Sequence, residues 1–312
     1  MAYFLAVDVG GTKTDYVLAD DTRELARVRT GTIKRLRIDA NTAASRLDHA
    51  LAELTLRSGI PMGSILCTCV GTAGESVPLV ADWLRHAIGT RVSGDLILLG
   101  DAEIALDAAF HGSPGVLVMA GTGSNVAGRM PDGSLTTAGG WGPTLADQGS
   151  GHKIGLACLR AAFLARDEGR ATVLLNAVLD FWKLPSLDHL VEYANSDPMP
   201  DFSRLTELIL HCAVEGDEVV ASVLEREGQD LAYLVRLVLR RIHIALASSD
   251  PNTQVSLPSL AFTGSILEKV PPVRRALIVA VQQEFPAVQP LDGVVDPIAG
   301  AIWRARSLAQ KR

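Results

Sequence analysis

Cysteine is scarce in this sequence: four residues among 312 cannot form the framework of a disulfide-stapled protein. Cys67 and Cys69 alternate in SILCTCVG and would face the same side of a strand, whereas Cys158 and Cys212 stand alone in apolar helical stretches. A zinc or iron–sulfur site would need more ligands at coordination spacing. We therefore expect buried free thiols and a reducing, cytoplasmic location.

An excess of positive charge and long apolar runs are also missing. Lys and Arg total 29 against 35 Asp and Glu, and the net charge of −6 argues against nucleic acid or an anionic membrane as a partner. The sequence contains no run of about 18 apolar residues, so we expect no transmembrane helix. The N-terminal MAYFLAVDVGG contains Asp8 and no basic region, so we expect a first strand and no signal peptide. With 48% hydrophobic and 21% charged residues, the chain is not predicted to be disordered.

Strands and helices alternate along the first 112 residues, which predicts an α/β domain. YFLAVDVGGTKTDYVLADD reads as a strand, a glycine turn and a second strand. Apolar residues then recur at helical spacing over 42–58, 77–89 and 102–112, and the apolar runs at 64–71 and 95–101 read as strands.

A second unit begins near Gly115 and repeats the opening pattern, because VLVMAGTGSNVAGRMPDG again gives a strand, a Gly/Thr turn, a second strand and an acidic turn. A glycine-rich run follows, and residues 153–248 are mostly helical by pattern. We expect a strand at 259–265, a helix near Ile266, a third strand-like region and a last helix opened by Pro297.

The two glycine turns are candidate phosphate-binding loops. Glycine permits close approach and positive φ, and successive backbone N–H groups with the hydroxyls of Thr12 and Thr122 can bind phosphate oxygens. Neither turn has the P-loop or the strand–helix G-x-G-x-x-G pattern. A single such turn is usually only a tight hairpin, but two matching turns favour phosphate binding.

Two aspartates adjoin predicted strand ends. Asp8 lies just before the first turn and could hold Mg²⁺ through water, or cap local amides. Asp101 follows the strand DLILLG and could accept a proton from a hydroxyl that attacks a γ-phosphate, or serve as a helix N-cap. In GGWGPTLADQGSG, Trp141 could be a platform for a sugar ring or a structural plug, and Asp147 could bind sugar hydroxyls or cap the next helix.

At these residues the chain resembles the N-acetylglucosamine kinase branch of the BadF/BadG/BcrA/BcrD-type ATPase family, part of the actin-like sugar-kinase superfamily. The resemblance rests on VDVGGTKT, VGTAG, LLGDAEIALDAA, VMAGTGSN, GGWGPTLADQGSG, AVEGD and FTGS, which occur in the family's order over nearly the whole chain. It implies an α/β fold of two ribonuclease H-like domains around a central cleft. We expect one domain over 1–112 with 297–312, and the other, with a helical insertion, over 113–296.

The resemblance also implies roles for single residues. Asp101 would be the catalytic base that deprotonates the sugar 6-hydroxyl and, with the sugar loop, would contact the sugar. Asp8 would hold Mg²⁺. The ATP phosphates would lie on Gly10, Gly11, Thr12, Lys13, Gly121, Thr122, Gly123 and Ser124, the nucleoside on Gly216, Gly264 and Ser265, and the sugar on Gly139, Gly140, Trp141 and Asp147.

One departure concerns the sugar. The family's amino-sugar kinases carry an Asn after the first hairpin, whereas this chain has RTGTIKRLRIDANTAAS, and its nearest Asn, Asn41, is interpreted as a helix N-cap.

The resemblance implies an ATP- and Mg²⁺-dependent kinase that converts N-acetylglucosamine to its 6-phosphate. Glucosamine or another hexose is the alternative substrate. Two other classes of protein are alternatives. An ATPase that activates an electron-transfer dehydratase would need a glycine-flanked cysteine pair, which this sequence does not contain. A sugar-binding regulator would carry a helix-turn-helix, for which we expect no room before the first strand. We expect a small-molecule sugar as partner and a chain that can form a homodimer, with neither nucleic acid nor membrane.

Overall fold

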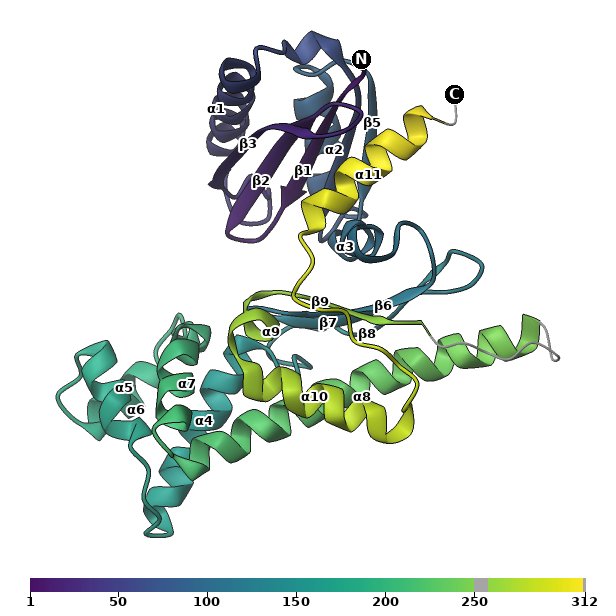
Figure 1. The fold of residues 1–312 in the computed structure, drawn as a ribbon. Helices are drawn as coiled ribbons and strands as arrows, with labels where there is room; N and C mark the ends of the chain where they lie inside the picture. Colours follow the sequence, from purple (N-terminus) through teal and green to yellow (C-terminus); the bar gives the residue numbers. More distant parts are fainter. Residues whose placement is uncertain (250–257, 311–312) are drawn as a thin grey trace. The chain divides into compact units, whose positions relative to one another are not determined.

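The computed structural model of the chain describes residues 1–249 and 258–310, and the chain divides into two compact units (Figure 1). Unit 1 comprises Met1–Gly115 and Val295–Arg312, and unit 2 comprises Val116–Val294. The C-terminal helix thus returns to the unit in which the chain begins. Within the two described ranges, no helix is long and apolar enough to cross a membrane.

Unit 1 contains a five-stranded sheet of order β3-β2-β1-β4-β5. The first three strands form an antiparallel meander, and β4 and β5 continue the sheet in parallel to β1. The strands are β1 (Tyr3–Val9), β2 (Lys13–Ala19), β3 (Glu24–Gly31), β4 (Ile65–Thr72) and β5 (Asp95–Leu99). This order gives the ribonuclease H-like unit expected from the resemblance.

Helices cover both faces of the unit 1 sheet, as the two-residue period of β1 requires. Leu5 and Val7 belong to the apolar cluster that includes helices α1 and α2, and Phe4 and Ala6 belong to the cluster of α3 and α11. Cys67 and Cys69 of β4 lie in that second cluster, which confirms that they share one face. The helices are α1 (Ala40–Ser58), α2 (Pro78–Gly89), α3 (Asp101–Phe110) and α11 (Pro297–Ala309), with a 3₁₀ turn at Met62–Ser64.

The α3–α11 contact is close enough to require glycine. A Cβ built on Gly300 of α11 would lie 1.8 Å from the carbonyl oxygen of Ile104 in α3. Backbone therefore packs on backbone here, and the buried Asp107 of α3 forms an ion pair with Arg304 of α11. This packing fixes the helix that begins at Asp101.

Unit 2 contains a four-stranded sheet of order β8-β7-β6-β9, the same strand–turn–strand beginning followed by a parallel strand. The strands are β6 (Gly115–Ala120), β7 (Ser124–Arg129), β8 (Leu135–Gly139) and β9 (Leu260–Thr263). The internal repeat predicted from the sequence is therefore visible in the topology, and the α/β class with two ribonuclease H-like units is confirmed.

The helices of unit 2 share one large apolar core with its sheet. The long helix α8 packs against α10, α4 and the strands β7 and β8 (Figure 1). The helices are α4 (Gly151–Asp167), α5 (Leu174–Trp182), α6 (Leu187–Ala194), α7 (Thr206–Val214), α8 (Glu218–Ser249), α9 (Ser265–Lys269) and α10 (Pro271–Glu284), with a 3₁₀ turn at Phe202–Leu205. The expectation of mostly helical structure over 153–248 is confirmed.

Several local expectations are wrong. Asn41 is not an N-cap: α1 begins at Ala40, and the Asp39 carboxylate accepts a hydrogen bond from the Thr42 amide. The third strand-like region before Pro297 contains one isolated bridge, between Leu260 and Pro290, and no strand. The sequence pattern also does not predict strands β3 and β8 or helix α10, which the structure contains.

Candidate active site

The first glycine turn joins β1 and β2 and leaves two amides free. The Gly10 carbonyl accepts a hydrogen bond from the Thr32 hydroxyl at 2.7 Å, and the Thr12 carbonyl accepts one from the Thr32 amide at 3.0 Å. The Gly11 and Thr12 amides have no hydrogen-bond acceptor in the described part of the chain. A Cβ on Gly11 would meet nothing within 4 Å. The turn is therefore an exposed pair of donors with space in front of them, as phosphate binding requires.

The second turn, between β6 and β7, is built in the same way by different neighbours. The Gly121 and Thr122 carbonyls accept hydrogen bonds from the first amides of α4, at 2.7 Å from Gly151 and 3.3 Å from His152. The Thr122 and Gly123 amides have no acceptor among the described residues. In both hairpins the carbonyls are thus tied back, and two successive amides remain for an anion.

Asp8 and Asp101 form an acidic pair in unit 1. Burial, followed by the negative charges of Asp101, Asp15 and Asp296, raises the pKa of Asp8 from 3.8 to about 7, and Lys13 opposes this rise. Burial also raises the pKa of Asp101, while the Ala102 amide and the Lys34 charge lower it. A carboxylate with a raised pKa is a better proton acceptor, which is the property of a general base.

Asp101 is the first residue of α3 and not its N-cap. Gly100 occupies the cap position without a side chain, and the Asp101 Oδ1 accepts a hydrogen bond from the Ala102 amide at 2.8 Å. The N-cap interpretation is therefore wrong in its position, although the carboxylate still satisfies one amide of the first helical turn. Asp101 Oδ2 accepts no hydrogen bond from the residues that the structure describes, so a substrate can donate one to it.

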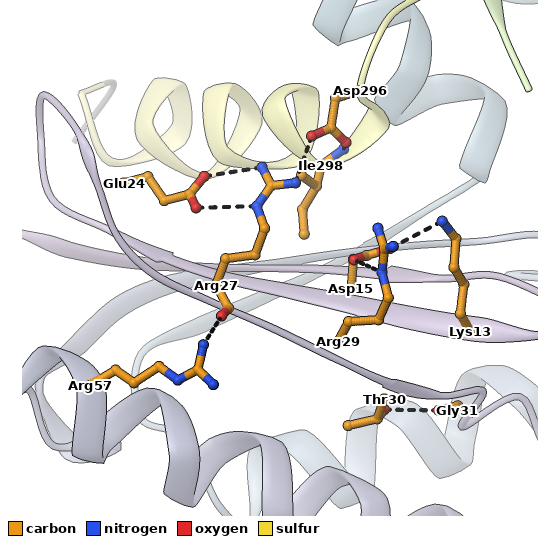
Figure 2. Close-up of polar contacts among 10 residues, drawn as sticks. All are labelled: Lys13, Asp15, Glu24, Arg27, Arg29, Thr30, Gly31, Arg57, Asp296 and Ile298. Carbon is orange, nitrogen blue, oxygen red and sulfur yellow. Dashed lines mark hydrogen bonds and ion pairs between the residues drawn. The ribbon is translucent and has the colours of Figure 1, made fainter. Parts of the chain in front are cut away.

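Lys13, a predicted phosphate ligand, forms an ion pair with a carboxylate of its own strand, β2. Its ammonium lies 3.9 Å from the Asp15 carboxylate, which also accepts a 2.6 Å hydrogen bond from Arg29 (Figure 2). Arg27 on the same strand as Arg29 binds Glu24 and Asp296, the N-cap of α11 (Figure 2). These ion pairs tie β2 and β3 to the C-terminal helix.

Asp147 links the glycine-rich loop to the second turn in unit 2. It is 4% exposed, its Oδ1 accepts a 2.6 Å hydrogen bond from the Ser124 amide, and its Oδ2 is buried without a partner. Ser150 caps α4, so the expectation that Asp147 might cap that helix is wrong. An unpartnered buried carboxylate oxygen is costly and indicates a position where a ligand donates a hydrogen bond.

Two side-chain amide oxygens near Asp147 are also buried without a hydrogen-bond partner among the described residues, and the sequence analysis predicts neither as a site residue. They belong to Asn125, which follows Ser124 on β7, and to Gln148, which follows Asp147. A Cβ on Gly140 would lie 3.0 Å from the Asn125 side chain, so the glycine-rich loop packs directly on it. Asn125 is the last residue of the motif VMAGTGSN, so a polar side chain directly after the second glycine turn was the sequence feature that could have indicated its role.

The glycine-rich loop itself has the backbone that only glycine adopts readily. Gly139 and Gly140 have φ values of 82° and 77°. Trp141 is 72% exposed, so it is not a structural plug. The loop thus presents an aromatic face and the Asp147 carboxylate within one short stretch.

A cavity of about 460 Å³ in unit 2 adjoins the second turn. Gly121, Thr122 and Ser265 line it, with residues of α7, α9 and the preceding 3₁₀ turn. Gly264, at the start of α9, has a φ of 98°, and a Cβ there would lie 2.3 Å from the Ala120 carbonyl. Gly216 lines a separate cavity of about 410 Å³ and is not brought together with the other predicted nucleoside residues.

The donor set in unit 1 fits Mg²⁺. Among residues 1–249 and 258–310 no group of three or more His, Cys, Asp and Glu side chains could hold a metal. Mg²⁺, however, is commonly bound by one or two carboxylates while phosphate oxygens and water complete its shell. Burial, and after it the negative charge of Asp101, raises the pKa of Asp8, and a divalent cation would favour the ionised form of both carboxylates.

The chain belongs to the BadF/BadG/BcrA/BcrD ATPase family, whose sequence model matches residues 5–305. It is 28% identical over 319 residues to the N-acetylmuramic acid/N-acetylglucosamine kinase of Clostridium acetobutylicum, covering 98% of this chain and 99% of that protein. It is 26% identical over 318 residues to the N-acetyl-D-glucosamine kinase of Dictyostelium discoideum, covering 96% of each.

Solved structures share the fold. A Porphyromonas gingivalis protein described as a proposed N-acetylglucosamine kinase matches with a TM-score of 0.71 at 24% identity, covering 98% of this chain and 99% of that one. The two-unit α/β architecture is therefore that of a known structural family.

Proposed function

We propose that this protein transfers the γ-phosphoryl group of ATP to the 6-hydroxyl of an amino sugar, with N-acetylglucosamine as the substrate. The observation that carries this proposal is the matched pair of glycine turns, each with its carbonyls tied back and two amides free. Two successive free amides in each turn can donate hydrogen bonds to the oxygens of a nucleotide phosphate. The full-length similarity to two amino-sugar kinases supports the same conclusion.

The residues that would bind nucleotide phosphates are Gly10, Gly11, Thr12 and Lys13 in unit 1, and Gly121, Thr122, Gly123 and Ser124 in unit 2. The 460 Å³ cavity that adjoins the second turn would take the nucleoside beside Gly264 and Ser265. Gly216 has less support for this role, because it lines a different cavity.

Asp101 would act as the general base. Its raised pKa and its second carboxylate oxygen suit proton removal from the attacking hydroxyl. The hydroxyl oxygen then forms a bond to the γ-phosphorus while the bond from that phosphorus to the ADP oxygen breaks and ADP leaves. Asp8, with Asp101 beside it, would hold the magnesium ion. The bound ion would neutralise charge on the phosphate oxygens.

The sugar would bind the orphaned acceptors of unit 2. Asp147 Oδ2, Asn125 Oδ1 and Gln148 Oε1 can only accept from hydroxyl or N–H donors, which an amino sugar supplies in number. Gly139 and Gly140 shape the loop, and the exposed ring of Trp141 offers an apolar surface to the C–H face of a sugar.

The four cysteines support the proposed cytoplasmic location and weigh against the electron-transfer alternative. Cys67, Cys69, Cys158 and Cys212 are all buried thiols outside any disulfide. Burial raises the pKa of the Cys69 and Cys158 thiols, which keeps them protonated and poor metal ligands.

The test is ADP formation by the purified protein with MgATP and a panel of sugars. We expect N-acetylglucosamine to accelerate ADP release and to become a 6-phosphate, identified by NMR. N-acetylmuramic acid, glucosamine and glucose complete the panel. Comparison of their rates shows how an acidic substituent, the acetyl group and the amine each affect the choice of substrate. If no sugar accelerates ADP formation, the kinase proposal fails, and iron in the preparation would then favour the electron-transfer class.

A further inference from the structure

The segment between β3 and α1 is attached to the first glycine turn. Thr32 donates its hydroxyl to the Gly10 carbonyl at 2.7 Å and its amide to the Thr12 carbonyl at 3.0 Å. The Lys34 amide in turn donates to the Thr32 hydroxyl at 3.0 Å. The backbone of Lys34 is thus two hydrogen bonds from the phosphate-binding turn.

Two further contacts keep this segment rigid. Ile33 is completely buried, and its amide donates to the Thr14 hydroxyl at 3.1 Å. The Arg46 guanidinium of α1 donates to the Thr32 carbonyl at 2.7 Å. The position of Lys34 relative to the turn is therefore determined by the fold and does not depend on a bound ligand.

The ammonium group of Lys34 has no assigned structural partner. It makes no hydrogen bond and no ion pair with any described residue, and its side chain is partly exposed. Its charge nevertheless acts on Asp101, whose pKa it lowers. By contrast, Lys13 on the turn is paired with Asp15, and Arg35 donates to the Ile38 carbonyl of its own loop. The backbone of Lys34 is thus attached to the phosphate turn, and its charge acts on the proposed base.

Resting on the proposed function, we propose that the Lys34 ammonium binds a non-bridging oxygen of the phosphoryl group while that group passes from the nucleotide to the sugar hydroxyl. In the step, the bond from the γ-phosphorus to the ADP oxygen breaks, and a bond to the sugar oxygen forms. The hydroxyl proton passes to Asp101, and Lys34 keeps its proton throughout.

The charge balance of unit 1 favours the phosphoryl group over the sugar as the partner of Lys34. Asp8 and Asp101 place two carboxylates where a triphosphate brings further negative charge. An ammonium is a compact point charge with donors only, which suits a phosphoryl oxygen in a site of low dielectric. A neutral sugar gains little from such a group, whereas a transition state with charge on its equatorial oxygens gains much.

The experiment compares Lys34→Met and Lys34→Arg with Arg37→Met, which removes the same charge from an exposed position of the same loop. With both substrates saturating, we expect Lys34→Met to lower kcat about 10²- to 10³-fold, the usual cost of one transition-state donor. Lys34→Arg should recover part of this loss, and Arg37→Met should stay within twofold of wild type. KM for the sugar and Kd for ADP should change less than about threefold.

A second measurement uses ADP, aluminium fluoride and sugar, which together imitate the phosphoryl group in transfer. Lys34→Met should weaken binding of this combination at least tenfold while ADP alone binds as before, which also shows that the variant is folded. A rise in the sugar KM with unchanged kcat would assign Lys34 to the sugar and overturn the proposal. If Lys34→Met and Arg37→Met had equal effects, Lys34 would contribute only its positive charge to the loop, and the proposal would be overturned. If the wild-type protein itself forms no sugar-dependent ADP, the proposed function has failed and this inference with it.

Discussion

Replacement of Asp8 by Asn should make the protein more stable and less active. Burial and three neighbouring carboxylates raise the pKa of Asp8 from 3.8 to about 7. At about 1.36 kcal/mol for each pH unit, the ionised carboxylate costs the folded state at most roughly 4 kcal/mol. The folded state binds more protons than the unfolded state between roughly pH 4 and 7, so wild-type stability falls as the pH rises through that window. Asn carries no charge and avoids this cost.

The assay is urea unfolding of the wild type and Asp8→Asn at pH 4 and pH 8, followed by circular dichroism. We expect no difference at pH 4 and a gain of about 1–4 kcal/mol for Asp8→Asn at pH 8, within the limit set by the pKa. Asp82→Asn, the same change at an exposed position of α2, is the control and should change stability by less than about 0.5 kcal/mol. ADP formation by Asp8→Asn should fall about 10²-fold or more if Asp8 is the magnesium ligand that we propose. A variant that is less stable at pH 8, or whose difference does not vary with pH, would refute the reasoning.

Three further predictions follow from the site. Asp101→Asn should lower kcat by about 10²–10⁴ with a thermal midpoint equal to or above that of wild type, since its pKa is raised in the folded state; near-normal turnover would exclude its role as base. Gly11→Ala should leave the thermal midpoint unchanged and raise the KM for ATP about tenfold or more, because the added methyl group would crowd a phosphate oxygen at the free amides by about the worth of one hydrogen bond to a charged group. Gly89→Ala, also with free space around its Cβ, should change neither. Asp147→Asn should raise the KM for the sugar about 10- to 100-fold through loss of one buried acceptor, whereas Asp132→Asn in the exposed β7–β8 turn should not; equal effects would show that Asp147 only supports the fold.

The parts of the fold that could be predicted are those whose signal is local. The first hairpin, with buried strands on both sides of Gly10 and Gly11, was recognisable because every residue of β2 after Lys13 is buried. The sequence pattern does not predict strands β3 and β8, because both are edge strands with few buried positions. In β3 the outward Arg27 and Arg29 interrupt the apolar pattern, and each has a partner on another segment, Asp296 for Arg27 and Asp15 for Arg29. An edge strand is therefore defined by its neighbour more than by its own sequence.

Helix caps show how closely two competing residues can stand. Asp39 and Asn41 lie two positions apart, and both residue types are favoured at N-caps. Asp39 takes the position because its carboxylate reaches the Thr42 amide and hydroxyl, at 2.9 and 2.7 Å. The backbone that leads into α1 decides between them, and that backbone is held by contacts of Thr32 and Ile33 with the first hairpin.

The site illustrates the same limit on a functional scale. Both glycine motifs predict a phosphate loop, but a Gly-Thr turn has such a function only if its amides are left unpaired. In the first turn this depends on Thr32, and in the second on Gly151 and His152, none of which lies within the turn that it supports. The same contacts that tie back the carbonyls also place Lys34 and the start of α4 beside the two turns. Residues that hold a loop open therefore position the neighbouring charges as well, which is why substitutions at Thr32 should affect phosphate binding and the Lys34 contribution together.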